Sequence, residues 1–174
     1  DKTIASFLTY GLITDTLGLT VRGLDAAVFD SVSELIGYGA DYSEVFDSFY
    51  RNVPREKMEL LARALSEIKY YIDGKIAVIY VSEKLLAKFG NKENYTVGLV
   101  DYLTRIQGVD VGISILQTKD KLFRISFRSN FTNVNEIAEV FGGGGHKYAS
   151  GAVLSGYFED VLDRLLFTVG NYLL

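Results

Sequence analysis

The spacing of apolar residues changes near residue 70, and this change limits the folds that the chain can adopt. Before it, apolar residues recur at steps of three and four, as at Met58, Leu61 and Leu65, which is the spacing of one buried helix face. After it, residues such as Ile113 and Ile115 alternate with others, which is typical of a strand. The sequence therefore predicts a helical region over residues 1–70 and an α/β region with a mixed sheet over residues 71–174.

Capping and turn residues indicate where individual elements begin and end. Asp25 precedes an apolar helical pattern and is a suitable N-cap. Asp73-Gly74 lies between two apolar segments and is a strong signal for a two-residue hairpin turn. Apolar residues at helical spacing predict a helix over Tyr95 to Ile106, and alternation predicts a second hairpin over residues 109–127.

Four consecutive glycines, from Gly142 to Gly145, precede the only histidine of the chain, His146. Glycine tolerates backbone conformations that a Cβ atom forbids, so such a run can turn its N–H groups toward an anion. Most glycine runs are flexible linkers. This one contains no Ser, Pro or charge and lies between two strongly patterned segments, which favours a defined turn.

A second polar group lies one predicted helix upstream of the glycine run. Arg128 and Ser129 end the second strand of the predicted hairpin. A strand end followed by a helix and a glycine turn can bring both positions to one sheet edge. The Arg fork, the Ser hydroxyl and the amides of Gly143, Gly144 and Gly145 would then form an anion cradle beside His146. Taken singly, Arg128 could be a surface cation and Ser129 a turn residue.

Composition narrows the classes of partner. The chain has 48% hydrophobic and 23% charged residues, which is ordinary for a folded protein. It contains no cysteine, so it has no disulfide framework and no thiolate zinc site. A net charge of −4 argues against a long nucleic-acid track and leaves room for short nucleotides. The sequence offers no membrane-spanning run and no leader, and we expect a cytoplasmic location without a membrane partner.

The order of these motifs resembles the C-terminal substrate-binding domain of the DHH phosphoesterase family. The family pattern is Arg-Ser, a short helix, Gly-Gly-Gly-His and Ala-x-Gly, and the last two elements match residues 142–146 and 149–151. Upstream, residues 10–16 (Tyr-Gly-Leu-Ile-Thr-Asp-Thr) resemble the last metal-binding motif of the family's catalytic domain. Residues 37–41 resemble the turn that follows it in the nano-RNase and adenosine-bisphosphate phosphatase branch.

The resemblance implies a metal-dependent phosphodiesterase that acts on short oligoribonucleotides, linear or cyclic dinucleotides, or adenosine bisphosphate. It also implies two bound divalent metals, usually Mn²⁺, with Asp15 as a catalytic metal ligand. Arg128, Ser129, the glycine amides and His146 would hold the substrate. Residues 1–70 would be the end of the catalytic domain and a helical linker, and residues 71–174 the substrate-binding domain.

The chain departs from the family pattern because it has neither Asp-x-Asp nor Asp-His-His. We therefore expect an upstream catalytic domain as partner, at most partial metal binding by this chain, and no activity of the chain alone. A nucleotide-binding or RNA-binding module without catalysis is the alternative. A homodimer stays open, with the stripe of Met58, Leu61 and Leu65 as its support, although such a stripe is usually core.

Overall fold

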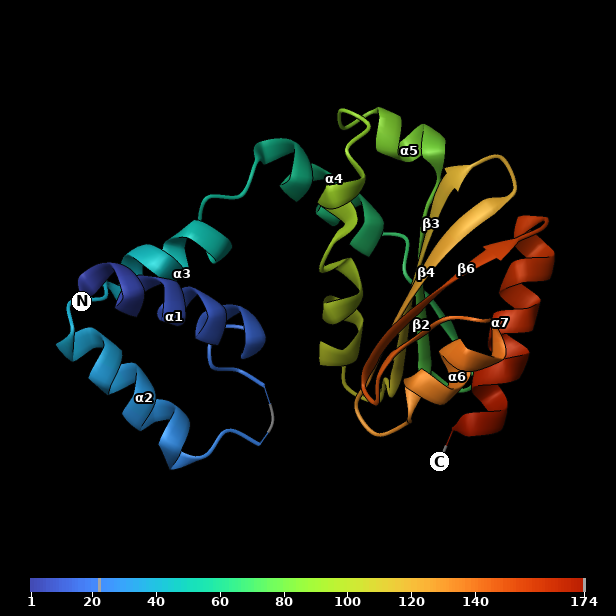
Figure 1. Cartoon of the computed structure of the whole chain (residues 1–174). Helices are drawn as coiled ribbons and strands as arrows, with labels where there is room; N and C mark the ends of the chain where they lie inside the picture. The colour runs from blue at the N-terminus through green and yellow to red at the C-terminus, as the bar shows by residue number, and fades with distance from the viewer. Residues whose placement is uncertain (22, 174) are drawn as a thin grey trace. The chain divides into compact units, whose positions relative to one another are not determined.

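The structure, a computed structural model, describes residues 1–21 and 23–173. The chain forms two compact units, Asp1–Pro54 and Arg55–Leu174, and each is described by itself (Figure 1). The predicted division of roles between residues 1–70 and 71–174 stays a prediction.

Three helices make up the first unit: α1 (Lys2–Asp15), α2 (Ala26–Gly37) and α3 (Tyr42–Tyr50). Each begins at an aspartate whose carboxylate accepts a hydrogen bond from a backbone N–H three residues on. The donors are Ile4 at 3.0 Å, Val28 at 3.2 Å and Glu44 at 3.0 Å. The N-cap predicted at Asp25 is confirmed. Such a cap stabilises a helix by about 1 kcal/mol, because it satisfies an amide that has no partner within the helix.

The second unit is an α/β fold built on one six-stranded sheet. Its helices are α4 (Arg55–Leu65), α5 (Glu83–Ala87), α6 (Val134–Val140) and α7 (Phe158–Tyr172), with the 3₁₀ helices η1 (Glu93–Thr96) and η2 (Leu99–Arg105). Its strands are β1 (Lys69–Tyr71), β2 (Ile76–Val81), β3 (Val111–Lys119), β4 (Leu122–Ser129), β5 (Gly144–His146) and β6 (Ala149–Ser155). The strand order is β1-β2-β3-β4-β6-β5. Only β2 and β3 pair in parallel, so the mixed sheet expected from the sequence is confirmed.

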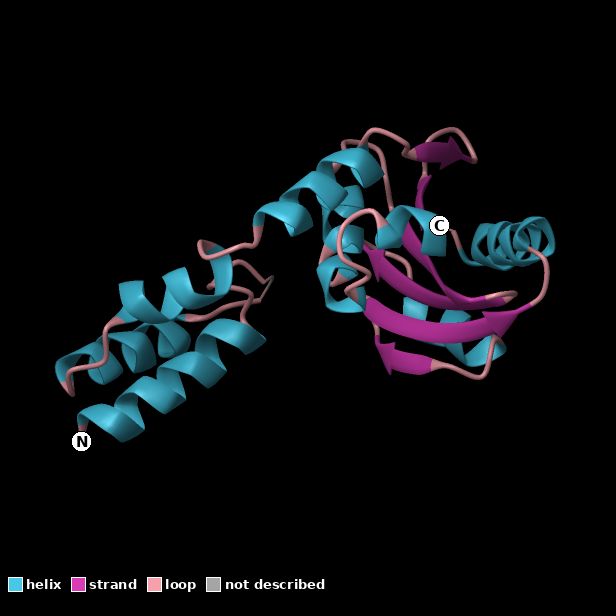
Figure 2. Ribbon diagram, turned by 90° about the horizontal axis from the view of Figure 1, so that it is seen from above, coloured by secondary structure: helices cyan, strands magenta, loops and turns pink. Residues whose placement is uncertain are grey.

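The two faces of this sheet are covered to different extents, with helices on both sides (Figures 1 and 2). On one face α6 and α7 pack against side chains of β2, β3, β4 and β6, including Ile113, Ile125 and Phe127. On the other face α4, α5 and the 3₁₀ helices pack around Ala77, Ile79 and other residues of β2 and β3. The core on this second face includes no residue of β4, β5 or β6 among the described residues, although η2 contacts β4 on this side. The residues of β4 that face this side, Arg124, Ser126 and Arg128, are polar.

Both predicted hairpins are confirmed, since β1 pairs with β2 and β3 pairs with β4 in antiparallel fashion. The helix predicted over Tyr95 to Ile106 is wrong. The structure has two 3₁₀ helices there, separated where Gly98 takes a φ of 89°, which a right-handed helix does not allow. The predicted apolar face of α4 is confirmed in part. Leu61 and Leu65 are half-buried against the core beside β2, in which Leu60 and Ala64 are fully buried, whereas Met58 is 49% exposed.

Candidate nucleotide-binding site

Arg128 and His146 lie in one row across the open part of the sheet. Arg128 of β4 pairs with Ala149 of β6, and Ala149 pairs with His146 of β5. Neighbouring strands lie 4.7–4.9 Å apart, so the Cα atoms of Arg128 and His146 are about 10 Å apart. The structure therefore brings together the two positions that the sequence placed at one sheet edge, with a single strand between them.

The glycine run forms the end of α6, a turn and the edge strand β5. Gly142 takes a φ of 73° after α6, and Gly144 to His146 pair with β6. The N–H of Gly143 donates to the carbonyl oxygen of Ala138 at 2.8 Å, so the predicted contact of this amide with an anion is wrong. A Cβ atom on Gly143 would lie 2.1 Å from the carbonyl oxygen of Gly151, and one on Gly145 would lie 2.5 Å from that of Ala149. The run is therefore a built element pressed against β6. Because β5 is the last strand of the sheet, its outer edge presents backbone groups that no further strand covers within residues 1–21 and 23–173.

The Arg128 side chain is held in place while part of its guanidinium remains accessible. Its Nε lies 2.7 Å from Asp101 Oδ1, and its Nη1 donates to the carbonyl oxygen of Phe127 at 3.0 Å. The side chain is 35% exposed. A guanidinium carries five N–H donors in a planar fork, so donors remain for a ligand after both contacts. Arg128 is thus an oriented cation at the open face.

Ser129 has a structural role in the turn that follows β4. Its Oγ donates to the carbonyl oxygen of Thr132 at 2.5 Å, and its N–H donates to the carbonyl oxygen of Tyr148 at 3.2 Å. With its proton committed to Thr132, the hydroxyl can accept a hydrogen bond but has none to donate to a phosphate. The turn-residue interpretation therefore has direct support, and a contact of Ser129 with substrate stays a prediction.

Asp110 fixes the loop after Ser129 and was not a predicted site residue. Its Oδ1 accepts hydrogen bonds from the N–H groups of Asn130, Phe131 and Thr132 at 3.2, 2.8 and 3.4 Å, and its Oδ2 accepts one from Thr132 Oγ1 at 2.6 Å. Asp110 is buried. An aspartate just before an apolar strand was the available signal, but its partners lie 20 to 22 residues away.

A groove lined by both polar and apolar residues adjoins Arg128 on the same face. It has a volume of ≈ 270 Å³, and Arg124 and Ser126 of β4 line it together with Arg128. Arg124 Nη1 lies 3.1 Å from Glu93 Oε2 on η1. Neither Arg124 nor Ser126 was a predicted site residue. In the sequence they are the polar residues that alternate with Phe123, Ile125 and Phe127 along β4.

Asp15 is the last residue of α1 and is exposed, in a different unit from Arg128 and His146. Within residues 1–21 and 23–173, no group of three or more His, Cys, Asp or Glu side chains is arranged to hold a metal ion. Because a divalent-metal pair needs several such ligands, the residues described do not fit a complete two-manganese centre. The role of Asp15 as one ligand stays a prediction.

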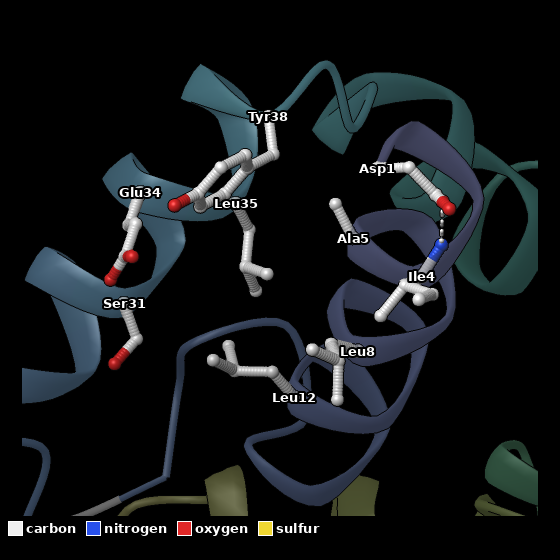
Figure 3. A pocket seen from close by; sticks show the side chains of 9 residues that line it. All are labelled: Asp1, Ile4, Ala5, Leu8, Leu12, Ser31, Glu34, Leu35 and Tyr38. Carbon is white, nitrogen blue, oxygen red and sulfur yellow. Dashed lines mark hydrogen bonds between the residues drawn. The ribbon is translucent and has the colours of Figure 1, made fainter.

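A larger cavity of ≈ 470 Å³ lies between α1 and α2 in the first unit (Figure 3). Leu8, Leu12 and Leu35 point into it, and the polar groups of Asp1, Ser31 and Glu34 lie around it. Arg and His side chains are missing from its lining, so this cavity has no cation for a phosphate. The candidate site is therefore the open sheet face of the second unit.

Fold and site together define an α/β domain that presents an oriented arginine and a histidine beside a glycine-rich edge strand. Residues 73–173 match the model of the DHHA1 domain family. The chain belongs to this family, which is the C-terminal domain of the DHH family that its motifs resemble.

Curated relatives match over most of this chain. It is 30% identical over 151 residues to the probable bifunctional oligoribonuclease and PAP phosphatase NrnA of Streptococcus mutans. The aligned region covers 85% of this chain and 47% of the relative. It is 28% identical over 166 residues to the bifunctional oligoribonuclease and PAP phosphatase NrnA of Bacillus subtilis, covering 95% of this chain and 51% of the relative. The chain thus spans about half the length of these relatives.

A solved structure shares the fold of the chain. An exopolyphosphatase-related protein from Bacteroides fragilis superposes with a TM-score of 0.92 at 26% identity, over 99% of this chain and 51% of that one.

None of the helices formed by residues 1–21 and 23–173 combines the length and the apolar character that a membrane-spanning helix needs.

Proposed function

We propose that this chain is the nucleotide-binding part of a phosphoesterase that hydrolyses short oligoribonucleotides, linear or cyclic dinucleotides, or adenosine bisphosphate. The observation that carries the proposal is the row formed by Arg128, Ala149 and His146 in a DHHA1 domain. The names of the Streptococcus mutans and Bacillus subtilis relatives, oligoribonuclease and PAP phosphatase, support this choice of substrates.

The residues of the row supply binding and orientation. The free donors of the Arg128 fork match the oxygens of a phosphate, and its contacts with Asp101 and Phe127 hold the fork in one direction. His146, about 10 Å away, contacts a second phosphate oxygen or the base. The outer amides of β5 add backbone donors. Holding a nucleotide at these points would orient its phosphoester for attack and remove rotational freedom before the reaction.

Hydrolysis itself requires groups beyond this row. In our proposal Asp15 supplies one carboxylate to a Mn²⁺ site whose other ligands come from an upstream catalytic domain. A bound metal pair would supply an activated water and stabilise the charge that develops on the phosphate. This chain alone would then bind nucleotides without turning them over.

A nucleotide-binding or RNA-binding module without catalysis is the second candidate. It is favoured by the lack of a metal-ligand cluster in the described residues. An assay of metal-dependent hydrolysis distinguishes the two functions. It uses a polypeptide that also carries the other metal ligands, and a pure binding module would stay inactive in this polypeptide.

Calorimetric titration of the chain with adenosine monophosphate and with a diribonucleotide, in the absence of metal, tests the proposal. We expect binding by the wild type and a loss of about tenfold or more in His146→Ala. The matched control is Lys84→Ala, which removes an exposed cation on α5. Equal affinity of His146→Ala and wild type would contradict the role of His146, and no binding by either would contradict the proposed site.

A further inference from the structure

We propose that the groove beside Arg128 is a second anion subsite, in which Arg124 binds another phosphate of the same short nucleotide. This inference rests on the proposed function, because it extends the Arg128 site along β4. The ligand that fits it carries two separate phosphate groups, as a nucleoside bisphosphate or a phosphorylated dinucleotide does.

The sheet register forms a trough between the two arginines. Residues directly opposite each other on neighbouring strands present their side chains to the same face. Three successive rows on β3, β4 and β6 are Gly112-Arg128-Ala149, Ser114-Ser126-Gly151 and Leu116-Arg124-Val153. The middle row therefore consists of small residues, and an arginine stands in each outer row. The hydroxyl-bearing residues Ser114, Ser126 and Thr96 line the ≈ 270 Å³ between them.

Each arginine already holds a different carboxylate. Arg128 pairs with Asp101 of η2, and Arg124 pairs with Glu93 of η1. The two Cα atoms are four residues apart on one strand, about 13 Å at the usual rise of a strand. The guanidinium groups are thus directed to two separate anions, which is the reason for assigning two phosphates to the ligand rather than one.

The two ion pairs differ in accessibility, and this difference assigns their roles. Asp101 and Arg128 are 28% and 35% exposed, and a further bond to Phe127 holds Arg128. The side chains of Glu93 and Arg124 are 48% and 43% exposed, and the contact between Arg124 Nη1 and Glu93 Oε2 at 3.1 Å is the one that joins them. An exposed pair of this kind contributes little to stability. A phosphate can therefore displace Glu93 from Arg124, while Asp101 keeps Arg128 oriented.

The arrangement makes Glu93 a competitor of the second phosphate. Its carboxylate occupies donors of Arg124 that the phosphate needs, and its negative charge opposes the ligand. Removing the positive charge at residue 124 and removing the negative charge at residue 93 should therefore change affinity in opposite directions.

The test compares adenosine 3′,5′-bisphosphate with adenosine 5′-monophosphate by calorimetry on the complete chain. We expect Arg124→Gln to weaken binding of the bisphosphate about tenfold and to change binding of the monophosphate by less than about twofold. We expect Glu93→Gln to strengthen binding of the bisphosphate about two- to fivefold. Arg164→Gln, which removes a guanidinium from α7 on the opposite face, should leave both affinities unchanged.

Arg128→Gln separates failure of this inference from failure of the proposed function. In one outcome, Arg128→Gln weakens the binding of both ligands, whereas Arg124→Gln and Glu93→Gln leave both affinities unchanged or change them equally. The second subsite is then overturned and the proposed function stands. If Arg128→Gln leaves both affinities unchanged, the proposed function is overturned and the second subsite with it. Opposite effects at residues 124 and 93, confined to the bisphosphate, support the inference.

Discussion

Gly143 and Gly145 lie so close to β6 that a side chain on either would enter the β6 backbone. This contact accounts for glycine at residues 143 and 145 without any ligand. Gly144, between them, has only Asn135 Oδ1 near its Cβ position, at 3.9 Å. At the scale of single residues, two of the glycines serve the packing of the strand edge that presents His146.

Gly143→Ala should therefore destabilise the second unit, while Gly144→Ala is the matched control. The alanine Cβ at residue 143 would meet the Gly151 carbonyl oxygen at 2.1 Å, so β5 would have to move. We expect a loss of about 3 kcal/mol in the free energy of unfolding, at the upper end of overpacking effects, and less than about 1 kcal/mol for Gly144→Ala. Urea denaturation measures both, and equal losses would contradict the packing role.

Asp110 stabilises the loop after β4 through four hydrogen bonds that enter its buried carboxylate. Asp110→Ala would remove the carboxylate that accepts from the buried Thr132 N–H and Oγ1–H and from the Phe131 N–H, whereas the Asn130 N–H keeps the carbonyl oxygen of residue 110 at 2.9 Å. We expect a loss of about 2–3 kcal/mol in the free energy of unfolding. Asp120→Ala, at the exposed turn between β3 and β4, is the control and should stay within about 0.5 kcal/mol of wild type. Equally small effects at both positions, measured by thermal and urea unfolding, would rule out this role.

At the scale of elements, local signals were sufficient for the hairpins and insufficient for the packed faces. The turn at Asp73-Gly74 and the alternation along β4 depend on neighbouring residues alone, and both were predictable. The buried face of α4 depends on where β2 lies, and helical spacing by itself allowed Met58 as readily as Leu60. The break at Gly98 was missed because apolar spacing outweighed a single glycine in the prediction.

Tyr80 on β2 gives the second unit a dependence on alkaline pH. Burial, and next the charge of Glu159, raise the pKa of Tyr80 above its ordinary value of 10.0. Its hydroxyl donates to Gln117 Oε1 at 2.8 Å. Because the folded state holds this proton more tightly than the unfolded state, the contribution is present below the ordinary pKa and is lost as pH rises through the raised pKa.

We therefore expect the free energy of unfolding to fall as pH rises above about 10, and to fall less in Tyr80→Phe. Tyr70→Phe changes an exposed tyrosine on β1 and should follow the wild type. Urea denaturation at a series of pH values measures the slopes. Parallel curves for all three proteins would show that Tyr80 does not contribute.

At the scale of the whole molecule, the order of motifs predicted the site better than any single residue did. Arg128 followed by a helix and the glycine run indicated one sheet edge, and the structure places Arg128 and His146 in one row. The sequence did not indicate that β6 lies between β4 and β5, because strand order depends on long-range pairing. Asp101, Glu93 and Arg124 were missed for the same reason, since each contact joins residues far apart in the chain.

The proposed division of labour also predicts the effect of Asp15 on metal content. In a polypeptide that carries the remaining ligands, Asp15→Asn should lose bound manganese and hydrolytic activity while nucleotide binding persists, because Asp15 lies in a different unit from Arg128 and His146. Elemental analysis of the purified protein measures the metal, and Asp30→Asn, an exposed aspartate of α2, is the control. Unchanged manganese in Asp15→Asn would remove this residue from the metal site.

The most direct test of the nucleotide site uses the single histidine of the chain. The imidazole Cε1–H proton of His146 gives one assigned signal in the proton NMR spectrum, because the sequence contains one histidine. Titration with adenosine monophosphate without metal should shift this signal in a saturable way, and Arg128→Gln should raise the ligand concentration needed for saturation about tenfold. A signal that stays in place up to millimolar nucleotide would contradict the account.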